Sequence, residues 1–168
     1  MTDQPRIQLR PWQEHDLPLL KEVFISTRWD EFIGAGMPEE QLRPLMDQQF
    51  HAQHTHYHKA WPEADYDIIL IDGEPAGRLY VDRDRKVELR IIDIALLPAF
   101  RGRGIGSRML RELIAEAHGQ GKAVRIHVEH NNPALRLYER LGFKHIDDSG
   151  VYYLMEHPAP EPATEGAS

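Results

Sequence analysis

The sequence predicts one mixed α/β domain built around a mixed β-sheet. The main observation is segment 88–114, which reads as an apolar strand, a proline stop, a basic glycine-rich turn and an amphipathic helix. A second helix is predicted to begin near residue 131, between a short strand at 124–128 and a terminal strand pair. Alternating runs before residue 82 supply further strands. The chain has 168 residues, enough for one such core and too few for two comfortable ones.

The N-terminal part reads as one strand followed by two helices. Residues 6–11 alternate as a strand does, and Asp16 is a plausible cap for a helix whose apolar residues recur at helical spacing. The helical pattern breaks at Gly34 and Gly36, and segment 38–40 opens a second helix. That helix carries four closely spaced histidines, at positions 51, 54, 56 and 58. No carboxylate or cysteine pattern accompanies them, so a polar helix face is predicted and no metal site.

Two strands are predicted next, over residues 66–71 and 76–82. The dipeptide Asp72-Gly73 signals the hairpin turn between them, and residues 74–75 are expected to lengthen the loop. A terminal hairpin is predicted from residues 143–146 and 151–155. The domain is predicted to cover residues 1–156. Residues 157–168 are rich in Pro, Ala, Glu, Gly and Ser, so a disordered tail is expected there.

The central strand is followed by a turn suited to phosphate. Pro98 stops the apolar run, and three glycines at positions 102, 104 and 106 allow a ligand to approach the backbone closely and allow positive φ. The amphipathic helix begins there, with an apolar stripe at residues 109, 110, 113 and 114. Unpaired amides at a helix start favour an anion, and Arg101 and Arg103 add positive charge. The turn therefore predicts a pyrophosphate site.

Two common phosphate loops do not fit this turn. A Walker A loop needs Lys-Ser or Lys-Thr after its last glycine, whereas Gly106 precedes Ser107 and Arg108. A dinucleotide fingerprint has a different glycine spacing. Arg101, Gly104 and Gly106 instead match Gln/Arg-x-x-Gly-x-Gly/Ala, and the turn thus resembles the acetyl-CoA signature of the GNAT superfamily of N-acyltransferases.

A second block, residues 131–143, resembles the other signature of that family, Asn-x-x-Ala-x-x-x-Tyr-x-x-x-Gly-Phe. Asn131 or Asn132 is placed to cap a helix, Tyr138 lies one to two turns into it, and Gly142 is placed to end it in a left-handed conformation. The resemblance covers residues 66–156 well and matches the earlier residues only as a coarse strand-then-helices pattern.

The resemblance implies a GNAT-like fold with a splayed central strand pair and an N-acetyltransferase that uses acetyl-CoA. Family members move the acetyl group directly to a primary amine in a ternary complex. The acyl-pantetheine arm would insert beside the central strand and the turn would hold the pyrophosphate. The residues so implicated in cofactor binding are Ile94, Ala95, Leu96, Arg101, Gly102, Arg103, Gly104, Ile105, Gly106, Ser107 and Asn131.

Catalysis requires an acid for the leaving thiolate and a route for the proton of the attacking ammonium. The resemblance assigns the acid to Tyr138, since a phenol with a pKa near 10 can protonate a thiolate with a pKa near 8.5. Glu88 and Asp93 are both candidates for the base, and either could act through water. Glu129 and His127 remain further candidates.

The N-terminal helices would flank the acceptor in this family. The residues between positions 29 and 32 are therefore candidate substrate contacts, although they read equally well as core and surface of a helical turn.

Composition narrows the remaining function classes. The net charge of −7 and the sequence pI near 5.8 argue against nucleic acid as a partner. The chain has no cysteine, which excludes disulfides and a cysteine acyl-enzyme. Without a long apolar run or a signal-like N-terminus, a soluble cytoplasmic protein without membrane partners is expected. The acceptor is expected to be a small-molecule or peptide amine. A homodimer stays open because family members are frequently dimers, and an acyl-CoA sensor without turnover is the alternative function.

Overall fold

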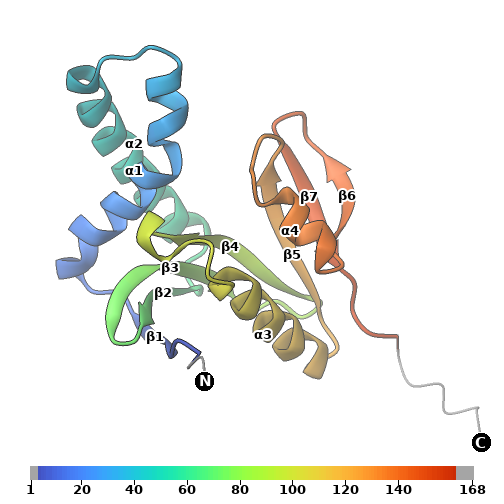
Figure 1. The fold of residues 1–168 in the computed structure, drawn as a ribbon. Helices are drawn as coiled ribbons and strands as arrows, with labels where there is room; N and C mark the ends of the chain where they lie inside the picture. The colour runs from blue at the N-terminus through green and yellow to red at the C-terminus, as the bar shows by residue number, and fades with distance from the viewer. Residues whose placement is uncertain (1–3, 162–168) are drawn as a thin grey trace, which may run out of the picture. The chain divides into compact units, whose positions relative to one another are not determined.

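The computed structural model describes residues 4–161, in which helices and strands alternate along the chain (Figure 1). The strands are β1 (Ile7–Pro11), β2 (Asp65–Ile71), β3 (Glu74–Asp82), β4 (Glu88–Leu96), β5 (Ala123–Glu129), β6 (Lys144–Asp148) and β7 (Tyr152–His157). The α-helices are α1 (Leu17–Gly34), α2 (Glu39–Ala60), α3 (Ile105–Gly119) and α4 (Leu135–Arg140), and two 3-10 turns cover Glu14–Asp16 and Pro98–Phe100.

The strands form a mixed sheet in the order β1-β2-β3-β4-β5-β7-β6. β4 and β5 run parallel, whereas β1 with β2, β5 with β7, and β6 with β7 run antiparallel. The parallel pair needs a crossover, which α3 supplies between β4 and β5. This arrangement confirms the predicted mixed α/β fold class.

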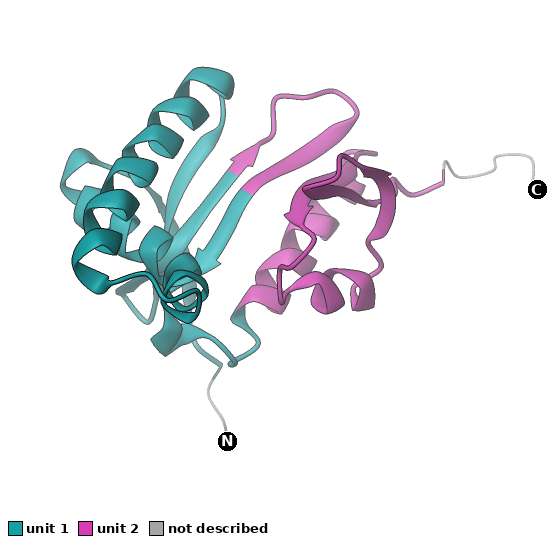
Figure 2. Cartoon of the chain, turned by 90° about the horizontal axis from the view of Figure 1, so that it is seen from above, with its two compact units in different colours: residues 1–80, 93–105 teal, residues 81–92, 106–168 magenta. Residues whose placement is uncertain are grey.

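The chain divides into two compact units, which Figure 2 shows in separate colours. Unit 1 holds residues 1–80 and 93–105, and unit 2 holds residues 81–92 and 106–168. The predicted single domain over residues 1–156 stays a prediction. His157 is the last residue of β7 and not the first of the tail, and residues 162–168 of the predicted tail lie outside the described residues.

Unit 1 packs its helices through regularly spaced apolar side chains. α2 buries Leu42, Met46 and Phe50 at four-residue spacing, so they lie on one face of the helix. The ring of Phe50 lies edge-on to that of Phe24 of α1, with the centroids 5.8 Å apart. The two helices therefore pack against each other through an aromatic contact in the core of unit 1.

The β2–β3 turn is tighter than its sequence predicts. Asp72 and Gly73 both have positive φ, 50° and 84°, and β3 begins at the next residue, Glu74. Two central residues with positive φ are typical of a two-residue hairpin turn. The hairpin was predicted correctly, but the expected lengthening by residues 74–75 was wrong because both belong to β3.

Asp16 occupies the N-cap position of α1 without capping it through its side chain. Its carboxylate accepts two hydrogen bonds of 2.8 Å from the Arg10 guanidinium and another of 2.8 Å from the Gln13 amide. The hydrogen bonds from Arg10, more than those from the backbone, lower the pKa of Asp16. The residue thus ties β1 to the start of α1.

Unit 2 has its core between α3 and the strands of its part of the sheet. Of the predicted apolar stripe of α3, Met109, Leu110 and Leu113 are buried and Ile114 is only half-buried. At the end of α4 the chain reverses at Gly142, whose φ is 104°, as predicted for a glycine after a helix.

Candidate functional site

The glycine-rich turn adopts the conformation that its sequence predicts at two of its three glycines. Gly102 and Gly104 have φ of 75° and 77°. Gly106 lies inside α3 and has no positive φ, so the prediction of positive φ was wrong there. α3 begins at Ile105, and the amides of a first helical turn have no partner within their own helix. The turn therefore offers backbone donors at a helix start.

The two arginines of this turn have partners within unit 1. The Nε of Arg101 donates to the carbonyl of Leu96 at 2.9 Å, and its Nη2 lies 3.2 Å from the hydroxyl of Ser26 in α1. The guanidinium of Arg103 lies 5.7 Å from the ring centroid of Phe100. Arg101 therefore connects α1 to the end of β4.

The segment of β4 implicated in pantetheine binding lies beyond the β4–β5 ladder. That ladder runs from Glu88↔Ala123 to Ile91↔Ile126, whereas β4 continues to Leu96. Residues 94–96 are half-buried. On the β3 side, the amide of Leu97 donates to the carbonyl of Ala76 at 2.8 Å, which holds the end of β4 in place.

Asp93 has a buried partner within unit 1. The Nε of Arg78 bonds to its carboxylate, and Nη2 of Arg78 donates to the side chain of Gln53 in α2 at 2.9 Å. The side chain of Arg78 is 3% exposed and that of Asp93 is 25% exposed. Burial alone would lower the pKa of Arg78, but the charge of Asp93 outweighs it and raises that pKa. The carboxylate in the apolar strand is thus explained by an ion pair that leaves one edge exposed.

Tyr80 lies against the same arginine. The guanidinium carbon of Arg78 is 5.0 Å from the Tyr80 ring centroid. Burial raises the pKa of Tyr80 to about 12, so this phenol stays neutral and donates no proton readily at neutral pH.

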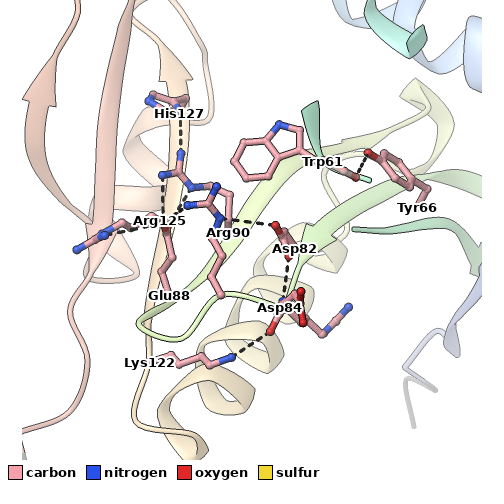
Figure 3. Close-up of polar contacts among 11 residues, drawn as sticks. Trp61, Tyr66, Asp82, Asp84, Glu88, Arg90, Lys122, Arg125 and His127 are labelled. Atoms are coloured by element: carbon pink, nitrogen blue, oxygen red, sulfur yellow. Dashed lines mark hydrogen bonds and ion pairs between the residues drawn. The ribbon is translucent and has the colours of Figure 1, made fainter. Parts of the chain in front are cut away.

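Glu88 lies in a cluster of arginines within unit 2 (Figure 3). Its carboxylate is 3.0 Å from Nε of Arg90, 3.2 Å from Nη1 of Arg85 and 3.9 Å from Nη1 of Arg125. The residue is 4% exposed, although the sequence places it at a strand start. A buried carboxylate with three cationic neighbours is poorly placed to accept a proton from a substrate.

His127 of β5 is held by the same cluster. Nη1 of Arg90 lies 2.9 Å from Nδ1 of His127, and Figure 3 shows the guanidinium between Glu88 and the imidazole. Loss of solvent around the ring and, to a lesser degree, the charge of Arg90 lower the pKa of His127. The imidazole is therefore favoured in its neutral form.

Tyr138 and Asn131 both belong to unit 2. Tyr138 is 4% exposed in α4, and its ring lies edge-on to Phe143 with the centroids 5.5 Å apart. Asn131 is exposed in the turn before α4. The predicted cap is Asn132, whose Oδ1 accepts from the amide of Ala134 at 2.8 Å.

The histidines of α2 divide into an exposed and a packed pair. His51 and His56 are exposed, whereas His54 lies edge-on to Trp12 at 4.9 Å and His58 stacks on Tyr66 at 3.9 Å. The predicted polar face is therefore wrong for His54 and His58, which pack against aromatic rings. Over residues 4–161, no group of three or more His, Cys, Asp or Glu could hold a metal ion.

Several residues of the site were not found by sequence reasoning. Arg78 and Gln53 were missed, although a lone arginine in the apolar run 76–81 was a usable signal. Ser26 gave no signal, because its contact with Arg101 joins residues far apart in the chain. Within residues 4–161, no helix is both long and apolar enough to cross a membrane.

Residues 24–143 match the acetyltransferase (GNAT) family. The N-alpha-acetyltransferase RimI of Mycobacterium tuberculosis is 36% identical over 78 residues, which cover 46% of this chain and 49% of that protein. The [ribosomal protein bS18]-alanine N-acetyltransferase of Haemophilus influenzae is 33% identical over 81 residues, covering 48% and 53%. The chain thus spans about half the length of the curated relatives that it matches.

Solved structures share the fold over nearly the whole chain. The PaiA N-acetyltransferase of Thermoplasma acidophilum, in complex with coenzyme A, superposes with a TM-score of 0.68 at 19% identity, covering 91% of this chain and 99% of that one. The ribosomal-protein-S18-alanine N-acetyltransferase of Escherichia coli gives a TM-score of 0.60 at 16% identity, covering 95% and 98%. At these identities the likeness shows the fold alone.

Proposed function

Because the chain belongs to the acetyltransferase (GNAT) family, we propose that it transfers the acetyl group of acetyl-CoA to a primary amine by direct attack in a ternary complex. The observation that carries the proposal is the glycine turn, with two positive-φ glycines immediately before the N-terminus of α3. That geometry supports recognition of a pyrophosphate by backbone amides. The coenzyme A complex of a protein with the same fold supports the choice of acetyl-CoA.

In this proposal the turn and the end of β4 bind the cosubstrate. The amides of Ile105, Gly106 and Ser107 hold the diphosphate, and Gly102 and Gly104 allow its close approach. The backbone of residues 94–96, beyond the β4–β5 ladder, hydrogen-bonds the pantetheine arm as a strand would. Asn131 and the guanidinium of Arg103 are assigned to the same cosubstrate.

Asp93 is the carboxylate that we assign to the acceptor. One side of it is fixed by Arg78, and its partial exposure leaves an edge for an ammonium group. Glu88 is less suited to that role because its carboxylate is buried among arginines. Asp93 accepts the ammonium proton directly or through a water molecule.

The bonding changes of the proposed reaction are those of acyl transfer. The ammonium loses its proton, the amine nitrogen forms a bond to the thioester carbon, and the carbon–sulfur bond breaks. The thiolate leaves with the electron pair of that bond and takes a proton from the hydroxyl of Tyr138. The position of Tyr138 in α4, matching the second signature, supports this assignment.

The relatives suggest which amines to test first. Two are named for acetylation of an α-amine or of an alanine of a ribosomal protein, so peptides with a free N-terminus are the first acceptors to screen. A third relative, a mycothiol acetyltransferase of Corynebacterium glutamicum, is 33% identical over 92 residues and makes small amines the second class.

The test combines cosubstrate binding with turnover. Calorimetric titration with CoA, competed by ATP and NAD, should show preference for CoA. Thiol release should follow addition of acetyl-CoA and an accepted amine. Tyr138→Phe should lower kcat on the order of 100-fold with little change in KM for acetyl-CoA, since only the proton donor is lost. Tyr153→Phe, in β7, is the matched control and should keep kcat. Binding of CoA without turnover of any amine would favour the sensor, and full activity of Tyr138→Phe would remove the acid.

A further inference from the structure

We propose that His127 is an acceptor-binding residue whose Nε2–H, fixed by Arg90, donates a hydrogen bond to an oxygen atom of the acceptor. The inference rests on the proposed function, because it names a chemical feature of the acceptor. It also removes His127 from the candidates for the general base.

The first step of the argument is the tautomer of the imidazole. Nη1 of Arg90 lies 2.9 Å from Nδ1 of His127. A guanidinium has only donors and keeps its charge in proteins, so Nδ1 must be the acceptor and carries no proton. In the neutral ring the proton is then on Nε2. The free nitrogen of His127 is thus a donor, and it has no lone pair with which to take a proton from an amine.

The second step is the rigidity of the arginine. Nε of Arg90 is 3.0 Å from Oε2 of Glu88, and the Arg90 side chain is 11% exposed. Glu88 is itself held by Arg85 and Arg125. The guanidinium therefore has one orientation, and the imidazole bonded to it is oriented too.

The third step is the charge state of the ring. Protonation of Nδ1 would break the bond from Arg90 and place two donors opposite each other. The other groups that act on the ring are Glu88 of β4 and Asp147 of β6, both anionic, and the ring of Tyr152 in β7, 6.4 Å away. Loss of solvent and the charge of Arg90 outweigh the two carboxylates and lower the pKa of His127. The donor therefore persists at neutral pH.

The fourth step is the place of His127 in the sheet. It is the first residue of β5 after the last β4–β5 pair, Ile91↔Ile126, and its side chain is exposed. An ammonium group has no acceptor for this N–H, whereas a carbonyl or carboxylate oxygen has. The acceptor recognised here is thus an amine that also carries such an oxygen, as every peptide does.

The tautomer can be tested without turnover. Long-range ¹H–¹⁵N correlation spectra of the full chain should show His127 with Nδ1 unprotonated and Nε2 protonated at pH 7. Arg90→Met should mix the tautomers, and Arg90→Lys is the second variant if the first fails to fold. Arg6→Met, at an exposed arginine of unit 1, is the control and should leave the signals unchanged. An Nδ1–H tautomer in the wild type would overturn the proposal.

Kinetics test the role toward the acceptor. His127→Phe should raise KM for an α-amino amide about 2- to 10-fold, the effect of one neutral hydrogen bond, and should leave KM for acetyl-CoA unchanged. His127→Gln, which keeps an N–H donor, should restore much of the loss. An alkylamine without oxygen should show no difference among the three proteins.

Two results would overturn this role and are distinguishable from failure of the proposed function. If His127→Phe removes a pH-dependent limb of kcat/KM, His127 is a base. If its KM for the amide equals that of the wild type, it does not bind the acceptor. Absence of CoA release by the wild type with every amine would instead refute the proposed function, and the acceptor role with it, while the spectra would still decide the tautomer.

Discussion

Gly77 of β3 is the position where a single methyl group should do most damage. A Cβ built there would lie 3.0 Å from Cα of Leu96 and 3.1 Å from the carbonyl carbon of Ala95, and closer still to the Ala95 oxygen. All three atoms belong to the backbone of β4, so no change of rotamer can relieve the overlap. Gly77→Ala must therefore move one strand relative to the other at the proposed pantetheine segment.

The expected cost follows from overpacking of a rigid site. Extra methylenes in well-packed cores destabilise by about 1 to 3 kcal/mol. For a chain of this size each kcal/mol lowers the melting temperature by about 2 to 4 °C, so a decrease of about 2 to 12 °C is expected. Affinity for CoA should fall as well, because the displaced carbonyl belongs to the segment assigned to the cosubstrate.

Calorimetric melting in the absence of ligand measures the first effect, and titration with CoA measures the second. Gly34→Ala is the matched control in unit 1, since nothing lies within 4 Å of its added Cβ and its φ is not positive. That variant should match or slightly exceed the wild type in stability. An unchanged melting temperature for Gly77→Ala would refute the close approach of β3 and β4 at this point.

Two further predictions concern buried ionisable groups. Glu88→Gln should destabilise the protein by on the order of 3 kcal/mol, measured by urea unfolding, because Arg90 would lose its buried carboxylate. The pH profile of kcat/KM should keep its shape, and a lost limb would instead identify Glu88 as the base. His54 and His58 have pKa values lowered by loss of solvent, so the unfolded chain binds more protons below about pH 6.5. Stability should therefore be full above that pH and decrease as the pH falls through the lower folded-state values. Urea midpoints between pH 8 and 5 measure this, and an equal slope in a His54→Phe/His58→Phe variant would contradict it.

Local features were the ones that the sequence predicted well. The Asp72-Gly73 turn, the stop at Pro98 and the reversal at Gly142 depend on the conformational limits of single residues, and all three were identified correctly. The family resemblance added the identity of the cosubstrate and of Tyr138, which spacing alone does not provide.

Partners of charged side chains could not be predicted in the same way. Glu88 reads as a solvated strand start, yet it is buried because Arg125 approaches from a strand that pairs with β4 only after folding. Asp93 reads as a carboxylate in need of a partner, and that partner is on β3, with its own support from α2. Such contacts depend on strand order, which a periodic pattern does not fix.

Arg101 gives the molecule a means of communication between its helical section and its cosubstrate. Its guanidinium spends its donors on the Leu96 carbonyl and on Ser26 of α1. An arriving diphosphate competes for those donors, and a pantetheine amide that pairs with Leu96 competes for the carbonyl. Occupation of the turn would thus loosen one tether of α1 at the moment when the second substrate has to enter, which favours an order of addition with acetyl-CoA first.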